Sequence, residues 1–218
     1  MVTDFWSPIR LSLEIAAVSG ILVLILGLFW GRVMANRRFR GAALIETLFL
    51  LPLVLPPTVV GFLLIYLFGH NSPVGQLIEW IFHQPVMFTW WAAVIASTVV
   101  AFPLMYQSAK TGFEAIDRDI EHAARVDGAS EWKLFFFVSI PLSLKAIISG
   151  AILSFARALG EFGATLMFAG NIPGKTQTTS TAIYVAIDAG NMQLAWLWVL
   201  SMIGISFLML ICTHLIKT

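Results

Sequence analysis

Charged side chains are scarce in this sequence. Only 11% of its 218 residues are Asp, Glu, Lys or Arg, whereas 59% are hydrophobic. A soluble domain typically has about a quarter of its residues charged, so a soluble fold of this chain would lack the charge to cover its surface. Together with a mean hydropathy of +0.88, this excludes an ordinary soluble protein. It indicates a single domain, residues 1–218, that lies in lipid.

Cysteine and clustered metal ligands are also nearly absent. The one cysteine, Cys212, has no partner for an intrachain disulfide. The histidines are scattered, so we expect neither a metal site nor a cofactor; they are His70, His83, His122 and His214. No basic stripe with interleaved aromatic residues is present, so nucleic-acid binding has no support. No catalytic constellation is visible either, and we expect the chain not to be an enzyme.

What the sequence does contain is long apolar stretches. A bilayer core of roughly 30 Å requires about 20 apolar residues of helix. Five stretches meet this length, near residues 9–34, 44–69, 86–109, 142–169 and 192–216. The sequence therefore predicts an all-α integral membrane protein with about five transmembrane helices.

The distribution of Lys and Arg predicts the orientation of these helices. The first loop is basic around Arg38, and the third contains Arg118, Arg125 and Lys133, whereas residues 70–85 contain no Lys or Arg. Cytoplasmic loops carry an excess of Lys and Arg. We therefore expect the N-terminus to lie outside and the C-terminus in the cytoplasm.

The third loop, residues 113–132, is charged and yet keeps helical periodicity. Asp117 is a suitable N-cap, Gly128 a suitable helix stop, and Ser130 a suitable cap for a following helix. A narrow apolar stripe recurs at helical spacing and consists of Ile116, Ile120, Ala123 and Ala124. Because the stripe is mostly alanine and the polar face is mixed rather than basic, we expect this helix to dock on a protein rather than on lipid.

The same loop resembles the EAA loop of permease subunits in ABC importers. The residues that carry the resemblance are Glu121, Ala123, Ala124, Gly128 and Ala129, followed by Ile140 and Pro141. One departure is that His122 stands at the family's glutamate position, with Glu121 one place earlier. The resemblance implies an ABC importer permease fold with a cytoplasmic coupling helix that docks in a groove of the ATP-hydrolysing subunit. ATP hydrolysis would then belong to that separate partner.

Two further segments resemble molybdate permeases more specifically. They are residues 51–61 (LPLVLPPTVVG) and 156–165 (ARALGEFGAT), and the loop 170–184 extends the match. The resemblance implies the permease of an ATP-driven importer that carries molybdate, and alternatively tungstate, across the cytoplasmic membrane. Its partners would be two ATP-binding subunits, a second copy of this chain and an external oxyanion-binding protein. A sulfate or thiosulfate permease is the alternative. A stand-alone secondary transporter is a further one, although no inverted repeat is visible.

The second apolar stretch contains closely spaced prolines. Pro56 and Pro57 remove backbone donors and clash with the preceding turn. A membrane helix tolerates this only where the freed carbonyls face protein or a watery cavity. The expected bend is either a packed kink or part of the translocation path. The resemblance favours the path and adds Thr58 and Gly61 to it.

The fourth stretch contains two charges within the predicted membrane region. Arg157 and Glu161 are four residues apart and so share one helix face, with Gly163 beside them. Since a charge in the bilayer costs at least about 2.5 kcal/mol, they form either a mutual salt bridge or a gate on the path. The same stretch has a face of small residues that favours close helix packing, made of Gly150, Ser154 and Ala158.

Overall fold

The computed structural model describes residues 5–35 and 39–217, with side chains described through residue 211. All regular structure in these ranges is helical. Three unbroken helices are long and apolar enough to cross a membrane: α1 (Trp6–Met34), α5 (Trp90–Glu114) and α12 (Met192–Lys217). These agree with the first, third and fifth stretches predicted from the sequence.

The second predicted span is not one helix. It consists of α2 (Ala42–Val54) and α3 (Pro57–Phe68), which are bent by 118° at Leu55 and Pro56. A bend was expected from the prolines, but the observed change of direction is much larger than a kink. Neither half is long enough to cross a bilayer alone, since 12 or 13 residues rise only about 20 Å.

The fourth predicted span, residues 142–169, is also divided. Its main helix is α9 (Leu144–Leu159), which ends before Gly160, and a second helix, α10 (Gly163–Ala169), follows. Ahead of α9, the segment Glu131–Leu142 meets it at 77°. That segment contains α7 (Glu131–Leu134), the π-helix η1 (Phe135–Ser139) and α8 (Ile140–Leu142). The described residues thus provide three unbroken candidate spans, or up to five if each bent pair counts as one.

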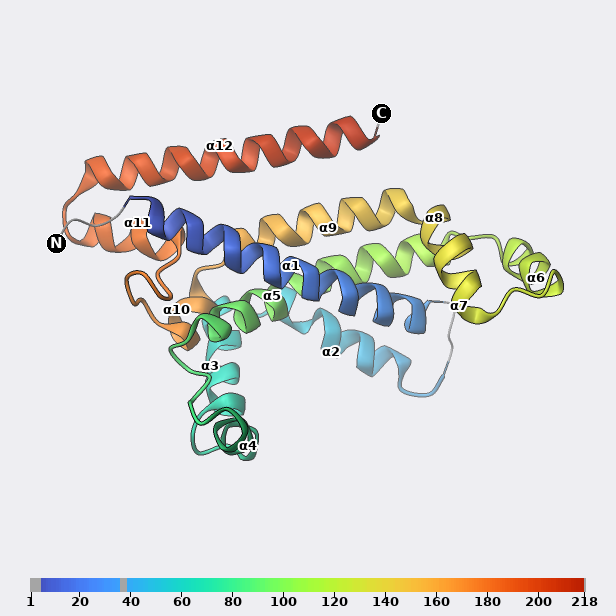
Figure 1. Ribbon diagram of the computed structural model, residues 1–218, viewed down its shortest axis with the longest axis horizontal. Helices are drawn as coiled ribbons and strands as arrows, with labels where there is room; N and C mark the ends of the chain where they lie inside the picture. Colours follow the sequence, from blue (N-terminus) through green and yellow to red (C-terminus); the bar gives the residue numbers. More distant parts are fainter. Residues whose placement is uncertain (1–4, 36–38, 218) are drawn as a thin grey trace.

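The centre of the molecule is a bundle of α1, α5 and α9, which run side by side (Figure 1). Small residues permit this packing. A Cβ added at Gly31 of α1 would lie 2.8 Å from the Cβ of Ala109 in α5. A Cβ at Gly150 of α9 would lie 2.5 Å from the Cβ of Ser108. The small-residue face predicted on the fourth stretch therefore packs within the chain, against α5.

The remaining helices lie around this bundle. They include the short helices α4 (Pro73–Phe82), α6 (Arg118–Val126) and α11 (Thr179–Asp188). In Figure 1, α3 and α4 project from the side of the bundle, whereas α12 covers α11 and α9. The outward surface of α12 is apolar and exposed, as expected for a helix that faces lipid or another subunit.

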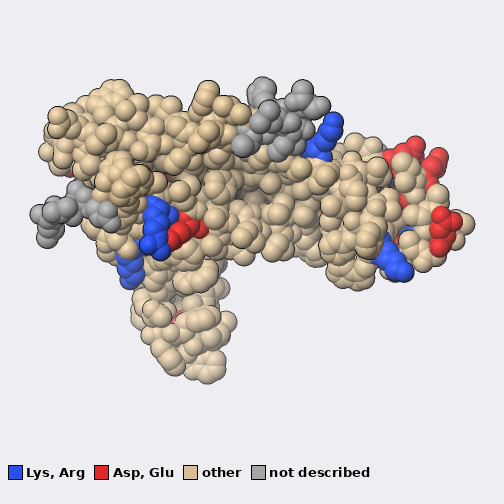
Figure 2. Space-filling view, turned by 45° about the horizontal axis from the view of Figure 1, so that its top comes forward, with Lys and Arg blue, Asp and Glu red and all other residues tan. Residues whose placement is uncertain are grey.

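The two ends of the bundle carry different loops. One end holds α6 and α7 together with the end of α1 and the start of α2, and the other holds α11 and residues 170–178 (Figure 1). The first and third loops, which were predicted to share a side of the membrane, thus share an end of the molecule, whereas the second loop, residues 70–85, contains α4 and projects from the side of the bundle. Arg37 and Arg38 lie outside the described residues. Figure 2 shows charged side chains gathered toward the two ends, with a broad uncharged band between them on the face shown.

Candidate coupling surface and translocation path

Helix α6 forms within the loop for which a coupling helix was predicted. Its N-cap is Asp117, whose carboxylate accepts a hydrogen bond from the Asp119 N–H at 2.9 Å. At its other end Gly128 has φ of 83°, and its N–H donates to the Arg125 carbonyl at 3.0 Å. The Ala129 N–H donates to the Ala124 carbonyl, also at 3.0 Å. These two bonds define a Schellman motif, and both predicted ends of the helix are confirmed.

Ser130 caps the next helix, as predicted. Its hydroxyl accepts a hydrogen bond from the Lys133 N–H at 3.4 Å. The turn between α6 and α7 is further fixed by Arg125, whose Nε donates to Glu131 at 2.8 Å. The hydrogen bond from this guanidinium holds the pKa of the Glu131 carboxyl below its usual value. The segment from α6 to α7 is therefore a defined turn rather than a loose loop.

Glu121 joins α6 to the rest of the molecule. Its Oε1 accepts a hydrogen bond from Arg32 of α1 at 2.8 Å and another from the Ser139 hydroxyl of η1 at 3.1 Å. Arg125 on the same helix lies 3.7 Å from its other oxygen. The Glu121 side chain is only 14% exposed. The sequence did not predict these contacts, which tie α6 to the end of one span and to the approach to another.

The outer side of α6 is open. Ala123 and Gly128 are exposed, and Ala124 and Ala129 are partly exposed. The predicted apolar stripe is not uniform, because Ile116 precedes the N-cap and is buried in the core beneath α5. The exposed apolar side chains near this end include Ile120, Val126 and Trp132. A surface of small and apolar residues beside charged ones suits a protein partner.

The candidate path residues of the second and fourth stretches come together in space. A Cβ added at Gly163 would lie 2.9 Å from the Cβ of Pro57 and 3.5 Å from the N of Thr58. A Cβ at Gly61 would lie 2.6 Å from the Cβ of Met167 on α10. Helices α3 and α10 thus cross with their backbones close together. The interruption between α2 and α3 and the interruption between α9 and α10 therefore face one another. The sequence alone did not reveal this.

The turn at this crossing is accessible. Pro56, Pro57 and Thr58 are exposed, whereas the next helical turn is buried at Val60 and Gly61. Proline in a membrane-spanning region is tolerated where the freed carbonyls face protein or a watery cavity. The turn therefore has one buried side against α10 and one side open to the surroundings of the single chain.

Arg157 and Glu161 form the salt bridge that the spacing allowed. The Arg157 Nη1 lies 2.9 Å from Glu161 Oε2, and the Glu161 side chain is 1% exposed, compared with 31% for Arg157. Glu161 has a second role, because its Oε1 accepts a hydrogen bond from the Ala164 N–H at 2.7 Å. A carboxylate there satisfies a free N–H at the start of α10. The pair therefore shapes the break between α9 and α10.

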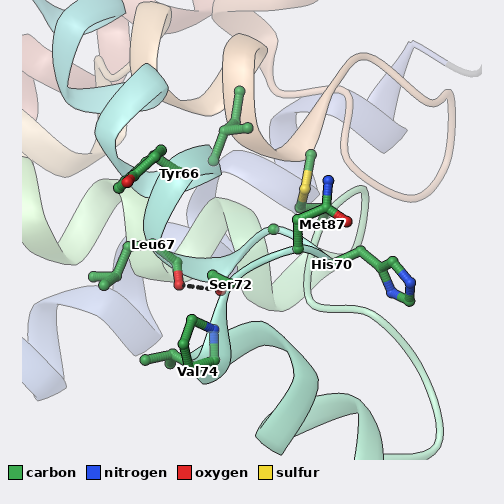
Figure 3. A pocket seen from close by; sticks show the side chains of 10 residues that line it. Tyr66, Leu67, His70, Ser72, Val74 and Met87 are labelled. Carbon is green, nitrogen blue, oxygen red and sulfur yellow. Dashed lines mark hydrogen bonds between the residues drawn. The ribbon is translucent and has the colours of Figure 1, made fainter.

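The junction between α3 and α4 encloses a pocket of about 540 Å³ (Figure 3). The Ser72 hydroxyl donates to the Leu67 carbonyl at 2.6 Å and accepts from the Gly75 N–H at 2.8 Å, so the junction is tightly turned. None of the lining residues is Lys or Arg, and His70 is the only one that can become cationic. The pocket is therefore not a site built for a dianion.

Among the described residues, three unbroken and two bent apolar spans, with a charged helix exposed at one end of the bundle, are the features of a multi-pass membrane protein. The family described as "Binding-protein-dependent transport system inner membrane component" matches residues 24–217. The chain belongs to this family. It is accordingly a multi-pass protein of the inner membrane and the pore subunit of an ABC importer, not an enzyme.

Named relatives indicate which transport systems contain similar permeases. YvgM of Bacillus subtilis (strain 168), whose name provisionally assigns it to a molybdenum transport system as a permease protein, is 63% identical over 216 residues. That match covers 99% of this chain and 95% of YvgM. ModB of Escherichia coli (strain K12), named molybdenum transport system permease protein, is 41% identical over 184 residues. That match covers 84% of this chain and 80% of ModB. The sulfate transport system permease protein CysT of E. coli (strain K12) is 34% identical over 181 residues. That match covers 82% of this chain and 64% of CysT.

Solved structures share the fold. A chain of the inward-facing MetNI methionine ABC transporter superposes with a TM-score of 0.75 at 16% identity, covering 100% of this chain and 98% of that one. A chain of a bacterial alginate ABC transporter, in complex with its alginate-bound periplasmic protein, gives a TM-score of 0.76 at 15% identity, covering 98% and 78%. These likenesses establish the fold of an ABC importer permease.

Proposed function

We propose that this chain is the permease of a molybdate importer, with tungstate as a second cargo. The observation that carries the proposal is the near full-length similarity to relatives named as molybdenum permeases. The sulfate permease CysT is less similar and is covered over a smaller share of its length. Molybdate, tungstate and sulfate are all tetrahedral dianions, so the site geometry of the permease alone does not select among them.

The assembly we propose contains two copies of this chain, two ATP-binding subunits and an external oxyanion-binding protein. The open outer side of α6, with Ala123, Ala124, Gly128 and Ala129, is the surface we assign to the ATP-binding subunit. Closure of the two ATP-binding subunits would draw the two α6 helices together. Since Glu121 links α6 to Arg32 and Ser139, this movement would reach α1 and, through η1 and α8, the span α9.

The path we propose lies between the two copies, along the turn of Pro56, Pro57 and Thr58. This turn is exposed in the single chain and packs against Gly163 of α10 on its inner side. Displacement of α9 would shift the Arg157–Glu161 pair, which holds the start of α10. The pair is thus placed to act as a gate element, and Arg157, the more exposed partner, could attract a passing dianion.

Uptake of labelled molybdate tests the cargo. Cells that lack their own molybdate permease should accumulate molybdate when this chain is expressed with its partner subunits. Excess unlabelled tungstate should suppress the uptake, and equal excess sulfate should not. Suppression by that excess of sulfate would contradict this proposal and favour a sulfate permease.

The proposed orientation is tested separately from the cargo. In a Cys212→Ser background, Asn71→Cys should react with an impermeant thiol reagent in intact cells, whereas Arg40→Cys should react only after the membrane is broken. Both residues are exposed, so a difference would report the side of the membrane. The reverse labelling pattern would invert the proposed topology.

A further inference from the structure

A cavity of about 850 Å³ lies where the end of α1 meets α6, α7 and η1. Its walls are of two kinds. One part is apolar and is formed chiefly by Ile25, Leu28, Phe29, Phe136 and Ile140. The other part is charged and is formed by Arg32, Arg118, Arg125, Glu121 and Glu131. A cavity divided in this way fits a ligand that is itself amphipathic.

The charged part of the cavity favours an anion. Three arginines and two carboxylates line it, and with Arg32 paired to Glu121 and Arg125 paired to Glu131, one positive charge remains in excess. Arg32 gives one nitrogen to Glu121, but a guanidinium has five N–H donors and can bind a phosphate in addition. Basic pockets beside membrane helices are a recurring place for anionic lipid headgroups.

The apolar part continues along the outside of α1. Ile25 is 59% exposed and Phe29 57% exposed, and Ile21 one turn further on is also 59% exposed. From Arg32 back to Ile21 the helix rises about 16 Å, which is close to half of a bilayer core of roughly 30 Å. A phosphate beside Arg32 therefore sits at headgroup depth when an acyl chain lies along this face.

We propose that this cavity is a binding site for an anionic phospholipid. Its phosphate is held by the arginines of α1 and α6, and one acyl chain lies along Phe29, Ile25 and Ile21. The lipid occupies the angle between α1 and α6, beside the Arg32–Glu121 contact that joins them. It therefore supports the position of the coupling helix from the membrane side.

Native mass spectrometry of the purified importer complex tests this proposal. The complex is offered phosphatidylglycerol or phosphatidylcholine with the same acyl chains. The wild type should retain phosphatidylglycerol preferentially. Arg118→Gln should reduce that preference by about fivefold, since one basic residue near a membrane surface contributes about 1 kcal/mol of attraction to anionic lipid. Arg10→Gln is the matched control, because Arg10 is exposed near the opposite end of α1, and it should leave the preference unchanged.

Two further arms separate the lipid from other occupants. Phe29→Ser should weaken retention of both lipids while their ratio stays the same, because it removes acyl contact only. Excess glycerol 3-phosphate should not displace the lipid; displacement would identify a site for a free anion instead. Equal retention of the two lipids by the wild type would overturn the proposal, as would an unchanged preference in Arg118→Gln.

Discussion

Arg32 and Glu121 are 89 residues apart in sequence and form a hydrogen-bonded ion pair of 2.8 Å between α1 and α6. Both side chains are largely shielded, with exposed fractions of 23% and 14%. Ser139 of η1 donates to the same carboxylate oxygen. The contact therefore fixes the exposed helix α6 to two membrane segments at once, in addition to its direct chain connection to α5.

A double-mutant cycle should detect this connection. Glu121→Gln and Arg32→Gln should each lower the free energy of unfolding in mixed micelles, and the coupling between them should be about 1–2 kcal/mol, as for a shielded charged hydrogen bond. The exposed pair of Arg10 and Glu14 is the control and should show no measurable coupling. Additive effects of the two α6–α1 substitutions would mean that the contact does not stabilise this junction.

Gly128 should tolerate substitution according to backbone conformation rather than size. Its φ is 83°, and an added Cβ would meet nothing within 4 Å. Asparagine enters this left-handed region readily, whereas a β-branched residue does so only with strain. We expect Gly128→Asn to retain most uptake and Gly128→Val to lose it while still reaching the membrane. Equal uptake by the two variants would show that the Schellman turn is not needed for coupling.

The crossing of α3 and α10 should be sensitive to a single methyl group. Gly61→Ala would place a Cβ 2.6 Å from the Cβ of Met167 and 3.1 Å from the Cα of Ala164. Overpacking of this kind typically costs about 1–3 kcal/mol, and a lower midpoint of thermal unfolding in detergent should report it. Gly204→Ala in α12 is the matched control, since its Cβ would meet nothing within 4 Å. If both variants melt alike, the close approach of α3 and α10 is incorrect.

The role of Arg157 and Glu161 can be tested without disturbing α10. Exchange of the two residues is unsuitable, because an arginine at position 161 could not accept the hydrogen bond from the Ala164 N–H. Arg157→Gln combined with Glu161→Gln removes both charges and keeps an acceptor for that N–H. If the pair acts in the gate, the double variant should insert and fold but lose most molybdate uptake. Wild-type uptake kinetics in this variant would show that the Arg157–Glu161 pair has only a structural role.

The sequence predicted those features that depend on local chemistry. Apolar length identifies spans, and Asp117 and Gly128 mark the ends of α6 because caps are set by one or two residues. The 118° bend at Leu55 and Pro56 was underestimated, since proline removes a donor but does not fix the angle that follows. That angle is set by the packing of α3 on α10, which is a tertiary contact.

Contacts between distant segments were the main omission. The pairing of Arg32 with Glu121 and the approach of Gly163 to Pro57 join residues that no local pattern relates. One signal was available for a further contact: Gly27 and Gly31 have the four-residue spacing typical of close helix packing, and both lie against α5. The charges at Arg157 and Glu161 were informative because a charged residue within a span requires a partner.

ATP-dependent molybdate accumulation in proteoliposomes tests the central claim most directly. The vesicles contain this chain and its ATP-binding partner, with the oxyanion-binding protein supplied on the opposite side from ATP. We predict that labelled molybdate accumulates only when ATP and the binding protein are both present, and that Ala124→Glu, which places a charge on the coupling surface, abolishes accumulation while the complex still inserts. Accumulation without ATP, or undiminished accumulation with Ala124→Glu, would contradict a permease driven through α6.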